Sequence, residues 1–305
     1  MEKPYERDID EALVDIDGNC LPWEKPHARA YPAMASALGR AAGLPYEQMV
    51  REMRQVYTRH GTIEYAALVQ EMDSFQIPPK LPSGKKRDKL LRRQQELIDL
   101  VRKARKKAMA GVNDGPYKNV KKLLKVLRAN HLDITALSDA PKNLAFLRLK
   151  TSRLLDKFDR VIGTRSPSDE LFDPRFHMED KPFPIPVLES DLPKPYSNLE
   201  KLRHVTAEEV SRNFIMIGNS MYSDDGLARR NGMLFYHSLW EDGTAEDRAI
   251  LAEFAPEALP AAAEQTVKKE PLITHPGYEM VDVEDPLLII EDLHRRQLIT
   301  LTPEP

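Results

Sequence analysis

Short apolar runs alternate with helical patterns along the second half of the chain. Residues 133–139 (DITALSD) and 159–164 (DRVIGT) are typical of buried strands, and residues 142–155 between them have a helical pattern. Residues 165–195 hold seven prolines and are expected to form a long loop. Three more runs are typical of buried strands: 11–17 (EALVDID), 214–218 (FIMIG) and 233–237 (MLFYH). The pattern predicts an α/β fold with a five-stranded, Rossmann-like, doubly wound parallel sheet.

A helical insertion separates the first predicted strand from the others. Apolar residues within 29–75 recur at helical spacing, and residues 85–109 are predicted to form one long amphipathic helix. We therefore expect two parts: an α/β core made of residues 1–25 and 126–305, and an α-helical domain made of residues 26–125.

Composition places the chain among ordinary folded proteins. Its 305 residues are 41% hydrophobic and 30% charged, which excludes collagen-like, low-complexity and wholly disordered chains. A net charge of −3 gives the whole molecule no general attraction for nucleic acid or anionic lipid. The single cysteine, Cys20, has no partner for an internal disulfide. No apolar stretch approaches a signal peptide or the ~20 residues of a membrane helix, so we expect a cytoplasmic protein without membrane contact.

Charge is unevenly distributed along the chain. Residues 80–107 carry twelve basic and three acidic side chains, a net charge of +9, whereas residues 241–305 carry five basic and fifteen acidic ones, a net charge of −10. The basic segment is either a solvated helix beside an apolar stripe, or an electrostatic funnel for a polyanion such as a nucleotide, sugar phosphate or nucleic acid end. Both interpretations stay open, because the acidic segment could cover the basic one.

Two aspartates follow the apolar part of the first predicted strand. In ALVDIDGNC (12–20), Asp15 and Asp17 precede Gly18, which permits a turn that could bring both carboxylates to one site. In open α/β sheets ligands bind outside the carboxyl ends of the strands. One carboxylate there could attack a substrate while the other transfers protons. The same Asp-x-Asp-Gly string also occurs in surface turns, so it indicates a catalytic site only together with further polar residues at neighbouring strand ends.

Three such residues follow in order. TALSDAP (135–141) has Ser138 at the end of an apolar run, LPKPYSNLEKL has Lys194 before a helical stretch, and MIGNSMYSDDG has Asp224 after another strand. This order of Asp-x-Asp, Ser, Lys and Asp resembles the four motifs of the haloacid dehalogenase (HAD) superfamily. The helical insertion is similar in position to the cap domain that this family carries after its first motif. The resemblance spans residues 10–20 and 130–240.

The resemblance implies a phosphatase that acts through an aspartyl-phosphate intermediate. Asp15 would attack phosphorus, and Asp17 would protonate the leaving oxygen and then activate water. Ser138 and Lys194 would bind the phosphoryl group and neutralise its charge. Clustered carboxylates need a cation, and hard oxygen ligands favour Mg²⁺, which Asp15, Asp224 and the backbone carbonyl of Asp17 would hold. Dehalogenases of the superfamily lack the second carboxylate, so Asp17 favours a phosphatase.

Two positions depart from the family pattern. Asn219 stands in the fourth motif where the family usually has an aspartate, and Asn19 stands where it usually has a threonine. An amide oxygen can coordinate Mg²⁺, so Asn219 counts among the predicted metal ligands, although it contributes no charge. Asp225 is not expected to bind the same ion as Asp224, because adjacent residues on a turn seldom point at one ion.

Two functions are compatible with these features. The first is a Mg²⁺-dependent phosphatase for a phosphorylated small molecule that the helical cap selects. The alternative is a nucleic-acid-associated or regulatory protein that keeps the HAD scaffold and uses the basic helix 85–109, with little or no turnover. The identity of the substrate and the oligomeric state stay open, because the cap carries no motif that specifies a ligand.

Overall fold

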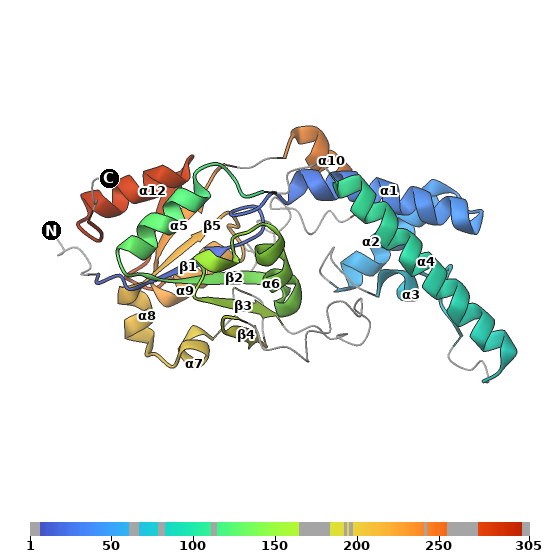
Figure 1. The fold of residues 1–305 in the computed structure, drawn as a ribbon, viewed down its shortest axis with the longest axis horizontal. Helices are drawn as coiled ribbons and strands as arrows, with labels where there is room; N and C mark the ends of the chain where they lie inside the picture. The colour runs from blue at the N-terminus through green and yellow to red at the C-terminus, as the bar shows by residue number, and fades with distance from the viewer. Residues whose placement is uncertain are drawn as a thin grey trace.

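A parallel sheet of seven strands forms the centre of the part of the chain that the structure describes (Figure 1). The computed structural model describes residues 7–60, 67–78, 83–110, 115–164, 184–191, 194, 198–240, 243–254 and 274–300. In spatial order the strands are β4 Val187–Ser190, β3 Arg160–Thr164, β2 Asp133–Pro141, β1 Glu11–Asp15, β5 Phe214–Gly218, β6 Leu234–Ser238 and β7 Glu279–Val283. Every neighbouring pair is parallel, which confirms the predicted doubly wound α/β fold.

The two outermost strands were absent from the prediction, so the expectation of five strands is wrong. β4 lies within the proline-rich stretch that was expected to be only a loop, and three of its four residues are half-buried. β7 has a single buried residue, Val283. Edge strands bury little surface, so neither has the continuous apolar run by which a central strand is found.

Helices cover both faces of the sheet because successive side chains of each strand point to opposite faces. Ala12 and Val14 of β1 belong to one apolar cluster, and Leu13 between them belongs to another. The first cluster lies under α5 Val120–Ala129, α6 Lys142–Thr151 and α12 Pro286–Arg295. The second lies under α7 Leu199–Arg203, α8 Ala207–Asn213 and α9 Asp224–Asn231. A short 3₁₀ helix, η1 Leu155–Lys157, follows α6.

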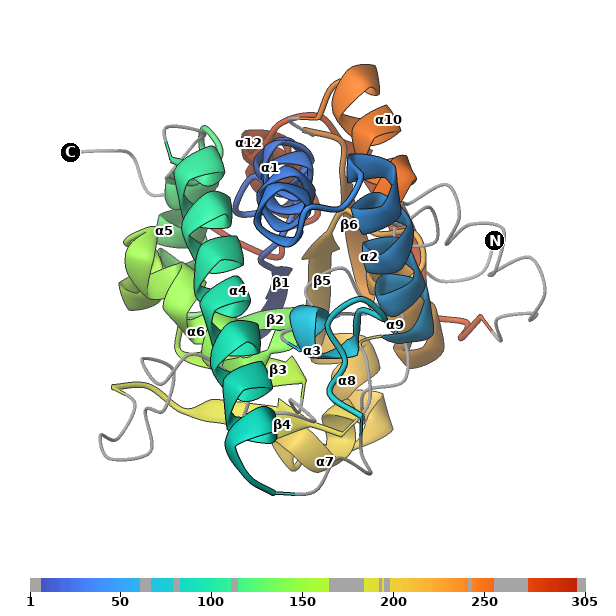
Figure 2. The same cartoon turned by 90° about the vertical axis from the view of Figure 1, so that its right-hand side faces the viewer.

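A second helical body lies beyond the carboxyl end of β1 (Figures 1 and 2). It consists of α1 Glu24–Ala42, α2 Tyr46–His60, α3 Leu68–Glu71, α4 Lys85–Met109 and α10 Ala245–Phe254. These helices share their own apolar cluster, to which α2 contributes Met49, Met53, Val56 and Tyr57 at helical spacing. We call this body the cap.

The long basic helix predicted at residues 85–109 is confirmed as α4. Its apolar stripe is only partly buried: Leu97 and Val101 pack in the cap cluster, whereas Leu90 is exposed. Two of its arginines form ion pairs within the helix, Arg93 with Glu96 and Arg102 with Asp99. Its role as a solvated face or as a recruiting surface stays a prediction.

The division into residues 1–25 and 126–305 against 26–125 also stays a prediction. Val120, Leu123 and Leu124 of α5 lie in the apolar cluster of the sheet, although they precede residue 126. Leu251 and Phe254 of α10 lie in the cap cluster, although α10 is distant in sequence from the other cap helices. No described helix combines the length and the apolar character that a membrane span requires.

Candidate active site

Three of the four predicted motifs lie at the carboxyl-end side of three neighbouring strands of the sheet. Asp15 ends β1 and is paired in register with Leu137 of β2, so Ser138 comes one residue past that pair. On the other side of β1, Val14 is paired with Ile217 of β5, and β5 ends one residue later at Gly218. Because parallel strands end at the same edge of a sheet, three of the four motifs meet there, in the region that open α/β sheets use for ligands.

Lys194 joins the third motif to the first and the fourth. Its Nζ donates hydrogen bonds to Asp15 Oδ1 and, at 2.7 Å, to Asp224 Oδ1. The three residues are buried, with relative exposures of 4%, 3% and 0% for Lys194, Asp15 and Asp224. An amine between two buried carboxylates is one charge short of neutrality, so the cluster retains a formal charge of −1.

The pKa shifts in this cluster follow from burial and from the mixture of charges. Burial raises the pKa of Asp15 well above its usual range; Lys194 counteracts this effect, and the carboxylates of Asp224 and Asp17 add to it. Burial opposes the charge of Lys194, but Asp15, Asp224 and Asp139 outweigh it and raise the pKa of this lysine. Lys194 therefore stays protonated at physiological pH.

A close approach at Gly218 lets Asp224 lie beside the end of β5. A Cβ atom at Gly218 would lie 2.3 Å from Asp224 Oδ2, a distance that no real Cβ contact tolerates. The same carboxylate oxygen accepts a hydrogen bond from the backbone N–H of Ser220 at 3.0 Å. Glycine at 218 is thus required for the position of the Asp224 carboxylate against the backbone.

Asp17 lies next to the second motif. Gly18 has a φ of 81°, the left-handed conformation that glycine adopts most easily, and it turns the chain after Asp17. Asp17 Oδ2 accepts a hydrogen bond from Ser138 Oγ at 3.3 Å and an ion-pair bond from Arg148 Nη1 at 2.5 Å. The structure therefore gathers five of the six predicted side chains into two groups, Asp15–Lys194–Asp224 and Asp17–Ser138.

Arg148 and Asp139 are two site residues that the motifs did not identify. Arg148 belongs to none of the motifs; it is the seventh residue of α6, and nothing in its sequence surroundings distinguishes it from a solvated arginine on a helix. Asp139 Oδ1 accepts a hydrogen bond from the backbone N–H of Lys194 at 2.7 Å, which ties the segment of the lysine to the end of β2. Its position directly after Ser138 was the only signal in the sequence.

Asn219 packs against the turn at Gly18, directly after Asp17. With its amide nitrogen turned toward the available acceptors, it donates to Asp15 Oδ2 at 3.2 Å and to the carbonyl oxygen of Asp17 at 3.3 Å. A Cβ atom on Gly18 would lie 2.3 Å from this amide, so Gly18 is needed for the contact. The amide nitrogen of Asn219 thus lies at the point where a carboxylate oxygen of Asp15 and the carbonyl oxygen of Asp17 converge.

This convergence fits a hard divalent cation. The described residues contain no group of three His, Cys, Asp or Glu side chains with ligand spacing. The candidate metal ligands around Asn219 are of mixed kinds: the carboxylate of Asp15, the backbone carbonyl of Asp17 and the amide of Asn219. Asp224 is joined to Asp15 through Lys194. Oxygen donors of this mixture are those that Mg²⁺ prefers. The amide of Asn219 would have to turn over before its own oxygen could join them.

Two neighbours of the motif residues have structural roles. Asn19 Nδ2 donates to the carbonyl oxygen of Asp15 at 2.9 Å and so braces the end of β1. Cys20 is fully buried in the apolar cluster of the sheet, where it serves as a packing residue.

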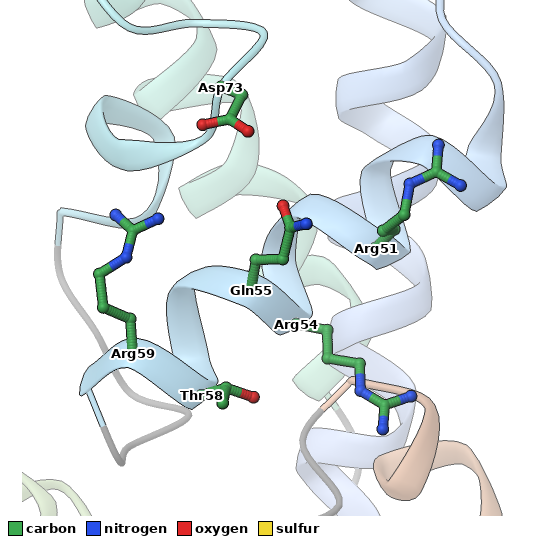
Figure 3. A pocket seen from close by; sticks show the side chains of 6 residues that line it. All are labelled: Arg51, Arg54, Gln55, Thr58, Arg59 and Asp73. Atoms are coloured by element: carbon green, nitrogen blue, oxygen red, sulfur yellow. The ribbon is translucent and has the colours of Figure 1, made fainter.

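A separate depression lies on the exposed side of α2 and beside α3 (Figure 3). Its volume is about 580 Å³, and its lining contains none of the predicted site residues. Arg59 in this lining forms an ion pair with Glu71 at 3.2 Å. The lining consists of Arg51, Arg54, Gln55, Thr58, Arg59 and Asp73.

No protein-family model and no curated protein sequence matches the chain. Solved structures similar to it include a phosphoglycolate phosphatase, itself assigned by prediction, from Haemophilus somnus 129PT (13% identity, 93% of this chain and 98% of that chain, TM-score 0.47). Another is a HAD family hydrolase from Deinococcus radiodurans R1 with bound phosphate and sodium (15% identity, 97% of this chain and 100% of that chain, TM-score 0.45). A third is a HAD phosphatase from Thermococcus onnurineus (19% identity, 78% of this chain and 89% of that chain, TM-score 0.45). Likenesses at such identities and TM-scores do not assign a function, which has to be inferred from the side chains of the site.

Proposed function

We propose that the chain is a Mg²⁺-dependent phosphatase with a haloacid dehalogenase-like core and that it hydrolyses a phosphorylated small molecule. The observation that carries the proposal is the contact of Lys194 with both Asp15 and Asp224, which draws three segments into one buried charged cluster. Burying such a cluster costs free energy, and perturbed ionisable groups in proteins are concentrated at functional sites. Such a cluster is therefore expected at a site that carries chemistry.

In the first half of the proposed reaction the phosphoryl group moves to Asp15. A carboxylate oxygen of Asp15 attacks phosphorus, and the bond from phosphorus to the leaving oxygen breaks. Asp17 donates its proton to that oxygen, so the products are an alcohol and an aspartyl-phosphate. Lys194 and Ser138 stabilise the charge on the transferred group, because one is a cation and the other a hydroxyl donor.

In the second half water releases the phosphoryl group. Asp17, now ionised, takes a proton from a water molecule as that water attacks phosphorus. The bond from phosphorus to Asp15 breaks, inorganic phosphate leaves, and both carboxylates return to their starting states. The same side chain thus serves as acid and then as base.

Mg²⁺ would be held by the carboxylates of Asp15 and Asp224, the carbonyl oxygen of Asp17 and, after it turns over, the amide of Asn219. When bound, the ion would supply positive charge to the nucleophile and the phosphoryl group. The formal charge of −1 on the Asp15–Lys194–Asp224 cluster supports a requirement for such a cation. Residues 26–125, in our proposal, form a domain that covers this site and selects the substrate.

The alternative of a nucleic-acid-associated or regulatory protein has only the charge of α4 in its favour among the described residues. We therefore retain the phosphatase alone.

The test is release of inorganic phosphate from a panel of phosphorylated small molecules, with and without Mg²⁺. We expect hydrolysis that requires Mg²⁺ and a loss on the order of 10³-fold or more in Asp15→Asn, about 4 kcal/mol of barrier. Asp10→Asn is the matched control, because Asp10 lies just before the other end of β1, where it accepts from Asn213. Near wild-type hydrolysis by folded Asp15→Asn would exclude the covalent mechanism, and no hydrolysis by the wild type under any condition would overturn the function.

A further inference from the structure

We propose that Arg148 is a positioning residue that holds the Asp17 carboxylate beside Ser138, in the orientation from which Asp17 exchanges a proton with the leaving oxygen. The inference rests on the proposed phosphatase function and assigns to Arg148, which belongs to none of the four motifs, a part in that reaction. Arg148 is placed by α6 and not by a strand end.

The contact between the two side chains is short and partly shielded from solvent. Arg148 Nη1 lies 2.5 Å from Asp17 Oδ2, and the side chains are 16% and 20% exposed. Charge-assisted hydrogen bonds from arginine to carboxylate are about twice as strong as neutral ones, and partial burial reduces their screening by salt. The pair is therefore stronger than the exposed ion pairs of α4, in which both side chains are at least 32% exposed.

The contact also selects one oxygen of the carboxylate. Ser138 Oγ donates to Asp17 Oδ2 at 3.3 Å, the same atom that Arg148 contacts. Among the described residues both side-chain bonds to this carboxylate thus end on Oδ2, and Oδ1 is the oxygen left for proton exchange. Two donors on one oxygen fix the rotation of the carboxylate more firmly than either alone.

The fold holds Arg148 rigidly enough for this task. α6 begins directly after β2, and its face formed by Ala145, Phe146 and Leu149 is buried under the sheet. Gly163 of β3 allows the start of the helix to approach closely, since a Cβ atom there would lie 2.5 Å from the Cα of Lys142. Arg148 is adjacent to the buried Leu149, so its backbone is anchored by core packing.

The role predicts a dependence on the leaving group. An alkoxide leaving group needs a proton from Asp17, whereas p-nitrophenolate is stable enough to leave without one. Replacing Arg148 by methionine removes the guanidinium and keeps an extended side chain. We expect kcat/KM, which covers the steps up to transfer of the phosphoryl group to Asp15, to fall about 10-fold or more for an alkyl phosphate and by less than about 3-fold for p-nitrophenyl phosphate.

Three further variants separate positioning from other roles. Arg148→Lys keeps the charge but lacks the planar fork, so it should recover only part of the loss. Asp17→Asn combined with Arg148→Met should be no slower on the alkyl phosphate than Asp17→Asn alone, because Arg148 acts through Asp17. Lys142→Met is the matched control, since Lys142 also lies on α6 and forms an ion pair, with Glu189 at 2.6 Å.

Several outcomes would overturn the proposal. An equal fall in kcat/KM for both substrates would contradict it: with a large rise in KM it would make Arg148 a direct ligand of the substrate anion, and with a lower melting temperature it would make Arg148 only structural. Additive losses in the double variant would show that Arg148 does not act through Asp17. A wild type without activity on either substrate would overturn the proposed function itself; a double-mutant cycle on melting temperature would then still detect or exclude the Arg148–Asp17 coupling.

Discussion

Asp224 and Asp225 are adjacent in the sequence, but their carboxylates have different partners. Asp224 Oδ1 accepts from Lys194 at 2.7 Å, within the candidate active site. Asp225 Oδ2 accepts from Arg229 Nε at 2.5 Å, and its other oxygen accepts from the hydroxyl of Tyr278. The guanidinium of Arg229 also lies 4.7 Å from the centre of the Tyr278 ring. Asp225 therefore ties α9 to the segment before β7, and Asp224 alone faces the site.

This separation predicts opposite consequences for one chemical change at the two positions. Asp224→Asn should lower kcat/KM by at least about 10²-fold, about 2.7 kcal/mol, because it removes a charge that balances Lys194 and would hold Mg²⁺. Asp225→Asn should leave kcat/KM within about 3-fold but lower the melting temperature by a few degrees, because a charge-assisted bond is lost. Steady-state kinetics and thermal unfolding of both variants measure the two effects. A comparable loss of activity in Asp225→Asn would place that carboxylate in the reaction.

The central strands of the sheet could be predicted because they are buried on both faces. β5 was predicted at residues 214–218 with its observed bounds, since all five of its residues are buried and apolar or small. β7 could not be found in this way, because Glu279, Met280 and Asp282 are exposed on an edge strand. Its residues resemble a loop in any local pattern, and only the pairing with β6 makes them a strand.

The motif residues could be predicted because each follows the end of a strand or a recognisable string. Arg148 could not, because it is one of several basic residues on a helix with little amphipathic pattern, and its partner Asp17 lies 131 residues earlier. The orientation of Asn219 was also beyond the sequence. Its residue type suggested a weak metal ligand, whereas its geometry makes it a donor to Asp15 and to the Asp17 carbonyl.

Asn219 should therefore weaken the binding of Mg²⁺ in two ways. It contributes no charge, and its amide nitrogen donates to two oxygens that the ion would need. Asn219→Asp removes the donor and adds a carboxylate, so we expect tighter binding of Mg²⁺ in calorimetric titration. In the absence of Mg²⁺ the same variant should melt at a lower temperature, because like charges then face one another without a cation. Unchanged affinity in Asn219→Asp would place residue 219 outside the coordination sphere.

The thiol of Cys20 should be unreactive in the folded protein. Burial raises its pKa well above the ordinary value, and the carboxylates of Asp15 and Asp17 raise it further. The thiolate is the reactive form, so iodoacetamide at pH 8.5 should label Cys20 in urea and leave the native protein unlabelled. Because the folded pKa lies above the unfolded one, the contribution of Cys20 to stability is complete below about pH 8.5 and is lost as pH rises toward the folded pKa. Rapid labelling of the native protein would contradict the buried position.

The stability of the cap should depend on a few buried residues of α4 and not on the length of the apolar stripe of that helix. Leu97 is 4% exposed and packs in the cap cluster, whereas Leu91, on the same helix, is 46% exposed. Leu97→Ala should destabilise the cap by about 2–5 kcal/mol, because it removes buried methyl groups and leaves a cavity. Leu91→Ala is the matched control and should cost less than about 0.5 kcal/mol.

The two tryptophans of the chain allow this effect to be localised. Trp23 packs against the cap cluster, and Trp240 packs against the cluster of the sheet and donates from Nε1 to the carbonyl oxygen of Asn19 at 2.9 Å. In a Trp240→Phe background the fluorescence of Trp23 follows the cap, and in a Trp23→Phe background that of Trp240 follows the core. Leu97→Ala should shift the urea midpoint of the Trp23 signal more than that of Trp240 if the cap has its own cooperative unit. Equal shifts of both signals would instead show that cap and core unfold together, and an unchanged Trp23 signal would mean that Leu97 does not support the cap cluster.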